Sequence, residues 1–117
     1  MPVLEPWTLH VTPTLVVSTA LATRDHQNVH HDRDAAIRLG SRDVFLNILT
    51  TTGLVQRFVT DRLGSHVTIR EIKIRLGTPC HAYDTLTFTG QQFPHGIEVV
   101  GRTASGVHVS GVVAVAR

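Results

Sequence analysis

The hydrophobic and polar positions of this 117-residue chain change their period near its middle. Before Gly64 the apolar residues recur at helical spacing, and after it they alternate with polar residues. A period of 3.6 predicts amphipathic helices, whereas a period of two predicts strands with one buried face. We therefore expect the helices to precede most of the sheet.

Two short helices are expected near the start of the chain. Pro13 suits the first turn of a helix over residues 14–23, because the first helical position needs no backbone donor. Asp34 is typical of an N-cap, and it predicts a brief helix over residues 35–39 that Gly40 would end.

A long helix is expected next, capped by Ser41 or Asp43 and ended by Gly64. Its middle, Thr-Thr-Thr-Gly at residues 50–53, consists of poor helix formers, each less favourable than Ala by a few tenths to about 1 kcal/mol. A helix that tolerates them is predicted to be buried and held by its surroundings. The apolar residues spaced to line this helix are Leu46, Leu49, Leu54, Phe58 and Val59.

The second half of the chain reads as consecutive strands. In residues 66–76 the apolar phase slips between Ile69 and Ile72, which predicts a β-bulge at Arg70-Glu71. Further alternating segments are separated by Gly- and Pro-containing turns, as in an antiparallel meander, and residues 7–11 fit one more strand. The predicted class is α+β, with a helix on one face of an antiparallel sheet.

Length and composition narrow the range of functions. A chain of 117 residues with 42% apolar residues fits one domain, residues 1–117. Its 11 basic and 9 acidic residues are scattered and form no basic stripe with aromatics, so nucleic acid is not expected as a partner. No run approaches the roughly 20 apolar residues of a membrane span.

A reducing, cytoplasmic location is expected from two features. The sequence shows no signal-peptide pattern, and its single cysteine, Cys80, cannot form an intramolecular disulfide. Beside Pro79, Cys80 is predicted to be a small packing residue rather than a nucleophile.

The candidate chemistry lies in one polar run, "ATRDHQNVHHDRDAA", residues 22–36. Asp25 and His30 are five residues apart, with turn-forming residues between them, so a carboxylate and an imidazole could converge. Such a pair can orient and deprotonate a water molecule. From spacing alone, a solvated polar loop is the simpler interpretation.

The same run offers a metal site as a further hypothesis. His26 and His30 have i,i+4 spacing, but no third ligand stands at a characteristic distance along the chain. His31 is expected to be exposed. The residues that this hypothesis would use are His26, His30, His31, Asp32 and Asp34.

The stretch "RDHQNVHHDRDAAIRLGSRDVFLNILTTTGLVQRFV" resembles the MaoC-like hydratases of the hotdog superfamily. Their signature is Asp-x-Asn-Pro-x-His, then a short helix and a His-Gly-Met that opens the long central helix. "IREIKIRLGTPCHAYDTLTFTG" is similar to the family's following strands, so the likeness covers residues 15–90. More narrowly, "STALATRD" and "NILTTTGLVQRFVTD" resemble the small subunits of heteromeric enoyl-CoA hydratases of steroid side-chain degradation.

This resemblance implies a single hotdog domain and an activity. Asp25 and His30 take the places of the family's catalytic Asp and His. The implied reaction is addition of water to a trans-2-enoyl-CoA, giving a (3R)-3-hydroxyacyl-CoA, with a steroid-type acyl chain. Backbone N–H groups of Asn47 and Ile48 would receive the charge that builds on the thioester oxygen. In this chain Asn47-Ile48-Leu49 stands where the family has His-Gly-Met.

The resemblance also implies no metal and no resident cofactor, because CoA is part of the substrate. It implies a homodimer, or a heteromer with another MaoC-like hotdog domain, since the family's acyl tunnel lies at a dimer interface. Two alternatives stay open: an acyl-CoA thioesterase on the same fold, and a non-catalytic subunit that completes a partner's site. The thioesterase would need a carboxylate in the long helix, where no acidic residue precedes Asp61.

Overall fold

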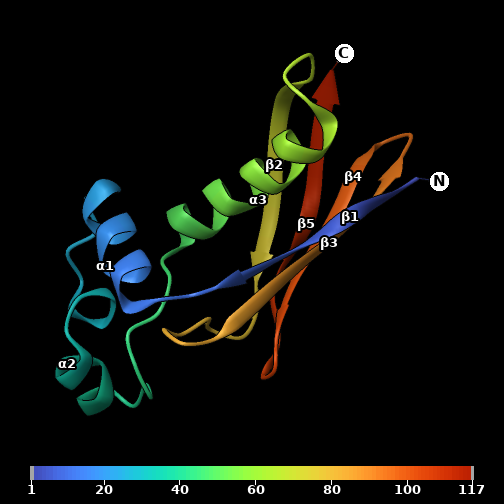
Figure 1. The fold of residues 1–117 in the computed structure, drawn as a ribbon. Helices are drawn as coiled ribbons and strands as arrows, with labels where there is room; N and C mark the ends of the chain where they lie inside the picture. The colour runs from blue at the N-terminus through green and yellow to red at the C-terminus, as the bar shows by residue number, and fades with distance from the viewer. Residues whose placement is uncertain (1, 117) are drawn as a thin grey trace.

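Five antiparallel strands form one sheet with a long helix on one face (Figure 1). The computed structural model describes residues 2–116. The strands are β1 (Val3–His10), β2 (Thr68–Leu76), β3 (Thr85–Phe93), β4 (Gly96–Thr103) and β5 (Gly106–Ala116). Their order across the sheet is β1-β3-β4-β5-β2, and every neighbouring pair is antiparallel. The predicted α+β class is confirmed.

The helical elements come between β1 and β2 along the chain. They are α1 (Pro13–Ala22), the 3-10 turn η1 (Asn28–His30), α2 (Arg33–Arg38) and α3 (Ile48–Leu63). Figure 1 shows α1 and α2 beyond one end of the sheet, while α3 crosses the sheet face. No helix within residues 2–116 has the length and hydropathy to cross a bilayer.

The two short helices start at their capping side chains. Pro13 begins α1 as predicted, and the Thr12 hydroxyl accepts a hydrogen bond from the Leu15 N–H at 3.0 Å. The cap predicted for α2 was wrong by two residues. Asp32, not Asp34, has the extended backbone of an N-cap, and its carboxylate accepts from the Ala35 N–H at 3.2 Å.

The start predicted for the long helix was also wrong: α3 begins at Ile48, beyond both Ser41 and Asp43. The preceding segment is extended because it is bonded to residues 80–82. The Leu46 N–H donates to the Cys80 carbonyl at 3.0 Å, and the Val44 carbonyl accepts from residue 82 at 2.9 Å. The helix therefore begins only after the last residue of this bridge. At the other end, Gly64 ends α3 as predicted.

The predicted buried face of α3 is confirmed at Phe58 and Val59 but is wrong near the start of the helix. Leu46 precedes the helix, and Leu49 is 56% exposed. Phe58 is fully buried and stacks on Phe88 of β3, with ring centroids 5.7 Å apart. The buried α3 residues are Thr50, Thr51, Val55, Phe58 and Val59, so two of the three threonines face the core.

The sheet follows the predicted alternation closely. The register of β2 against β5 shifts between Ile69 and Glu71, which confirms the predicted bulge. The first strand is longer than residues 7–11, and its Trp7 stacks on Phe88 at 5.6 Å.

Cys80 is fully buried, and burial raises the pKa of its thiol to about 12, as expected of a packing residue.

Two glycines have opposite surroundings. Gly111 of β5 lies where a Cβ atom would be 2.2 Å from the Lys73 carbonyl oxygen of β2. Gly53 of α3 is exposed, and a Cβ atom there would meet nothing within 4 Å. The first glycine is required for strand packing in this chain, and the second is not.

Candidate active site

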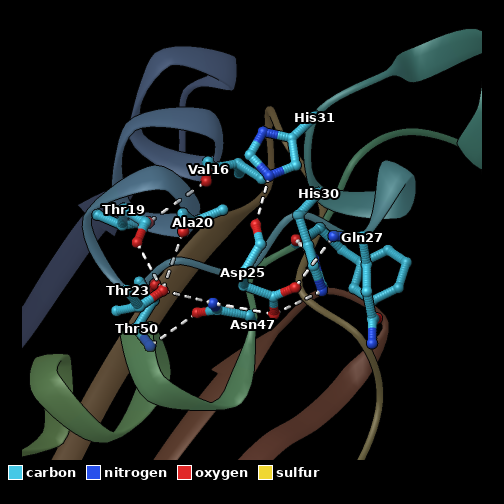
Figure 2. A network of polar contacts seen from close by, with 11 residues as sticks. Val16, Thr19, Ala20, Thr23, Asp25, Gln27, His30, His31, Asn47 and Thr50 are labelled. Carbon is cyan, nitrogen blue, oxygen red and sulfur yellow. Dashed lines mark hydrogen bonds and ion pairs between the residues drawn. The ribbon is translucent and has the colours of Figure 1, made fainter.

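Asp25 and His30 lie close together, with Asp25 Oδ2 3.4 Å from His30 Nε2 (Figure 2). Asp25 directly follows α1, where Arg24 takes a left-handed conformation with φ 57°. The Asp25 N–H donates to the Ala20 carbonyl at 2.8 Å, which closes the end of the helix. His30 ends η1, so a helix end and a single turn bring the two side chains together.

His30 is held by a main-chain carbonyl. Its Nδ1 atom lies 2.7 Å from the Phe45 oxygen, and because a carbonyl accepts, Nδ1 carries the hydrogen. In the neutral ring, the lone pair on Nε2 then faces Asp25. The imidazole is 5% exposed, and the Phe45 ring meets it edge-on at 5.0 Å.

The Asp25 carboxylate accepts hydrogen bonds on both oxygens. Oδ1 accepts from the Gln27 N–H at 3.2 Å, and Oδ2 accepts from Asn47 Nδ2 at 3.2 Å. Desolvation by burial raises the pKa of Asp25. The two hydrogen bonds and the nearby His30 and His31 together lower the pKa by more than burial raises it, so the pKa lies below its usual 3.8. At neutral pH the group is an ionised acceptor.

Asn47 has a role that sequence reasoning missed. Its backbone was predicted to bind substrate, whereas its side chain also caps α3, with Oδ1 accepting from the Thr50 N–H at 2.8 Å. Its Nδ2 also donates to the Thr23 hydroxyl at 2.8 Å. An Asn immediately before a hydrophobic helical run is a recognisable N-cap signal, and it could have identified this helix start.

The first turn of α3 begins next to this pair, after its N-cap Asn47. The N–H groups of Asn47, Ile48 and Leu49 have no hydrogen-bond partner within residues 2–116. Ile48 and Leu49 are 53% and 56% exposed. A helix N-terminus carries partial positive charge, so free donors lie where the resemblance implied an oxyanion site.

The other histidines of the polar run have structural contacts. His31 was expected to be exposed, which is wrong: it is half-buried, its Nε2 donates to the Asp25 carbonyl, and its ring stacks on His26 at 6.2 Å. Across residues 2–116, no group of three His, Cys, Asp or Glu side chains could hold a metal ion.

Asp84 stabilises the turn over residues 81–84. Its carboxylate accepts from the His81 N–H at 2.9 Å and forms an ion pair with Arg42. Desolvation and the Arg42 charge lower the pKa of His81. The Arg42 guanidinium is therefore engaged by Asp84.

A second buried histidine lies under α3, and no sequence pattern singled it out. His108 of β5 is 2% exposed, with Nδ1 2.8 Å from the Thr78 carbonyl and Nε2 2.8 Å from Thr51 Oγ1. Desolvation lowers its pKa. Its partners are distant in sequence, so the alternation of β5 could not reveal it.

Comparisons with known proteins place this chain in a family. No protein-family model matches the sequence. The chain is 53% identical to the 3-oxo-4,17-pregnadiene-20-carboxyl-CoA hydratase beta subunit of Mycobacterium tuberculosis, over 95% of this chain and 90% of that protein. It superposes on a chain of the ChsH1-ChsH2 complex from the same organism with a TM-score of 0.93 and 52% identity, covering 98% and 94% of the two chains.

More distant structures share the fold. The R-hydratase PhaJ1 from Pseudomonas aeruginosa matches with a TM-score of 0.85 and 14% identity, over 98% of this chain and 81% of that one. The predicted hotdog fold is confirmed by these neighbours. The chain belongs to the MaoC-like hotdog hydratases, in the family of the 3-oxo-4,17-pregnadiene-20-carboxyl-CoA hydratase beta subunit.

Proposed function

We propose that this chain is the catalytic subunit of an enoyl-CoA hydratase, with Asp25 and His30 as its catalytic residues. The observation that carries the proposal is the 3.4 Å approach of Asp25 Oδ2 to His30 Nε2. The name of its hydratase relative, 53% identical, supports the same reaction. The substrate is a trans-2-enoyl-CoA, and the product is a (3R)-3-hydroxyacyl-CoA.

The hydrogen bonding of the pair suits the activation of water. With Nδ1 donating to the Phe45 carbonyl, the neutral ring of His30 presents a lone pair, and the ionised Asp25 presents another. A water molecule between two acceptors directs one O–H bond at each, which leaves an oxygen lone pair free to attack. The pair thereby orients the water and accepts its proton.

The reaction balances without a redox partner or a leaving group. The water oxygen bonds to C3, and the π electrons move toward C2 and the thioester oxygen. One water proton passes to the Asp25–His30 pair and the pair delivers a proton to C2, so the pair ends the cycle in its starting protonation state. No resident metal or cofactor is part of this proposal.

The thioester oxygen becomes more negative as C3 is attacked. We assign its stabilisation to the backbone N–H groups of Asn47 and Ile48, which are unpaired at the positive end of α3. Loss of a donor of this kind typically raises the barrier by about 3–4 kcal/mol. Side-chain substitution cannot remove the N–H itself, except with proline.

The exposed apolar surface around the site supports an assembly with a second subunit. Leu21, Ile48 and Leu49 are each more than half exposed beside an Asp25 side chain that is 23% exposed. We propose that a second hotdog subunit covers them and completes the acyl tunnel, as the complex in the related structure suggests. The substrate class would be a steroid-type side-chain CoA thioester, in keeping with the relative's name. We propose a cytoplasmic location with it, since a chain with a single cysteine suits a reducing compartment.

The thioesterase alternative has less support. It requires a carboxylate on α3 near the thioester, and the acidic residue of that helix is Asp61, near its far end. Asp61 is bonded to Arg57 there, with Arg57 Nε 3.4 Å from Asp61 Oδ2.

The test follows the absorbance of an enoyl thioester during hydration. The protein is assayed with a short-chain and a steroid-type enoyl-CoA, alone and with a hotdog subunit that lacks its own Asp–His pair. Wild type should hydrate at least one substrate, and Asp25→Asn and His30→Ala should each be slower by about 10²–10⁴-fold. Asp34→Asn, an exposed carboxylate in the first turn of α2, is the matched control and should keep full activity.

Two results would overturn the assignment. Equal rates for wild type and both site variants would remove Asp25 and His30 from the chemistry. Release of free thiol from a saturated acyl-CoA, with no hydration, would favour the thioesterase, and the buried Cys80 would not interfere with that thiol assay.

A further inference from the structure

The side chain of Asn47 joins three separate segments of the chain (Figure 2). Its Oδ1 accepts from the Thr50 N–H in the first turn of α3. Its Nδ2 donates both to the Thr23 hydroxyl after α1 and to Asp25 Oδ2. The residue is 5% exposed, so water competes little for these contacts.

The partners leave the amide one orientation. A backbone N–H can only donate, so the Thr50 N–H requires Oδ1 on its side. The ionised Asp25 carboxylate can only accept, so it requires Nδ2. The Thr23 hydroxyl gives its proton to the Thr19 carbonyl at 2.9 Å, and its oxygen is left to accept from Asn47. A flipped amide would lose the contacts with the Thr50 N–H and the Asp25 carboxylate.

We propose that the Asn47 side chain is a positioning residue, which fixes Asp25 Oδ2 against His30. The inference rests on the proposed function, in which Asp25 accepts a proton from water. One hydrogen bond from Nδ2 still leaves Oδ2 a lone pair for that proton, so the contact orients the base without blocking it.

The same side chain links the base to the proposed oxyanion donors. The cap fixes where α3 begins, and the first N–H groups of α3 are the donors that would receive the thioester oxygen. Asn47 therefore sets the spacing between Asp25 and these donors. Mispositioning by as little as 1 Å can lower a rate by about 10²-fold.

The test separates the capping role of Asn47 from its contact with Asp25. Asn47→Ser keeps a preferred capping oxygen and removes the amide donor, while Asn47→Asp keeps the cap and adds a carboxylate beside Asp25. Thr23→Val removes the oxygen that orients the amide. Thr12→Ala, which removes the cap of α1 outside this network, is the control for general loss of a helix cap.

The first measurement is an NMR titration of the ¹³C-labelled Asp25 carboxyl, assigned with Asp25→Asn. The pKa of Asp25 should rise in Asn47→Ser and rise most in Asn47→Asp, because a donor is lost and then a like charge is added. It should also rise in Thr23→Val and stay unchanged in Thr12→Ala. An unchanged Asp25 titration in all the Asn47 and Thr23 variants would overturn the inference.

The second measurement is the pH dependence of kcat/KM in the assembled hydratase. The acidic limb should move to higher pH in Asn47→Ser, and kcat should fall about tenfold to a hundredfold with little change in KM. A purely structural role would lower activity without moving the limb. Because the NMR titration needs no turnover, failure of the hydratase proposal would be seen separately, as an inactive wild type.

Discussion

Thr51 Oγ1 on α3 lies 2.8 Å from His108 Nε2 on β5, and both side chains are buried. The other ring nitrogen, Nδ1, donates to the Thr78 carbonyl, so the neutral ring accepts the threonine hydroxyl proton on Nε2. This contact joins the long helix to the sheet through the one type of side chain that changes charge near neutral pH.

The stability of the fold is expected to fall as the pH drops below about 6.5, in part because of His108. Desolvation lowers the pKa of the folded-state imidazole below 6.5, so the unfolded chain takes up a proton first. The loss should level off once the pH passes below the folded-state pKa. Urea unfolding of wild type and His108→Asn between pH 8 and about pH 5 measures it.

The expected result is a flatter pH dependence in His108→Asn than in wild type. His81 also has a lowered pKa, so the dependence should decrease without disappearing. The exposed His10 provides the control, and His10→Asn should retain the wild-type slope. Parallel curves for wild type and His108→Asn would contradict the assignment to this buried ring.

Two glycine substitutions are expected to change stability in opposite directions. Gly53→Ala should stabilise the isolated chain by about 0.5–1 kcal/mol, because the position is helical and nothing lies near a new Cβ atom. Gly111→Ala should destabilise it by about 1–3 kcal/mol, since the Cβ atom would overlap the Lys73 carbonyl. Denaturant midpoints at pH 7 measure both.

Gly53→Ala also tests what the small residues of α3 are for. If they leave room for a bulky acyl chain, this variant should hydrate the steroid-type substrate more slowly than the short-chain one while being more stable. Equal effects on both substrates would show that Gly53 leaves no room that the acyl chain uses.

The tautomer of His30 is expected to be Nδ1–H. The Phe45 carbonyl lies 2.7 Å from Nδ1 and can only accept, so the proton of the neutral ring must be on that atom. Long-range ¹⁵N–¹H spectra above pH 7 should show a protonated Nδ1 and an unprotonated Nε2. The opposite pattern would remove the acceptor that the proposed mechanism directs at water.

Local features of the fold could be predicted because few alternatives compete with them. The apolar alternation changes phase between Ile69 and Ile72, and a bulge is the simplest way to keep both side chains on one face of the sheet. The structure has that bulge. The five-residue spacing with a turn between them allowed Asp25 and His30 to converge, but spacing alone favoured a solvated loop, and the family resemblance was what implied the pair.

Features that depend on distant contacts could not be predicted. Ser41, Asp43 and Asn47 are all of residue types that commonly cap helices. Asn47 is the N-cap of α3 because the bridge between residues 44–46 and residues 80–82 keeps the preceding segment extended. The exposure of Leu49 follows from that later start. His108 depends on Thr51, 57 positions away, so no local pattern in β5 marks it.

The hydrogen bond from His30 to the Phe45 carbonyl has a genetic consequence. A histidine oriented by a carboxylate side chain can be disabled by one missense change in the codon of its partner. Here the acceptor belongs to the main chain, and every amino acid at position 45 supplies the same oxygen. The orientation of His30 should therefore tolerate substitution of residue 45. It should not tolerate a deletion or an insertion between positions 41 and 47, because either would displace the carbonyl.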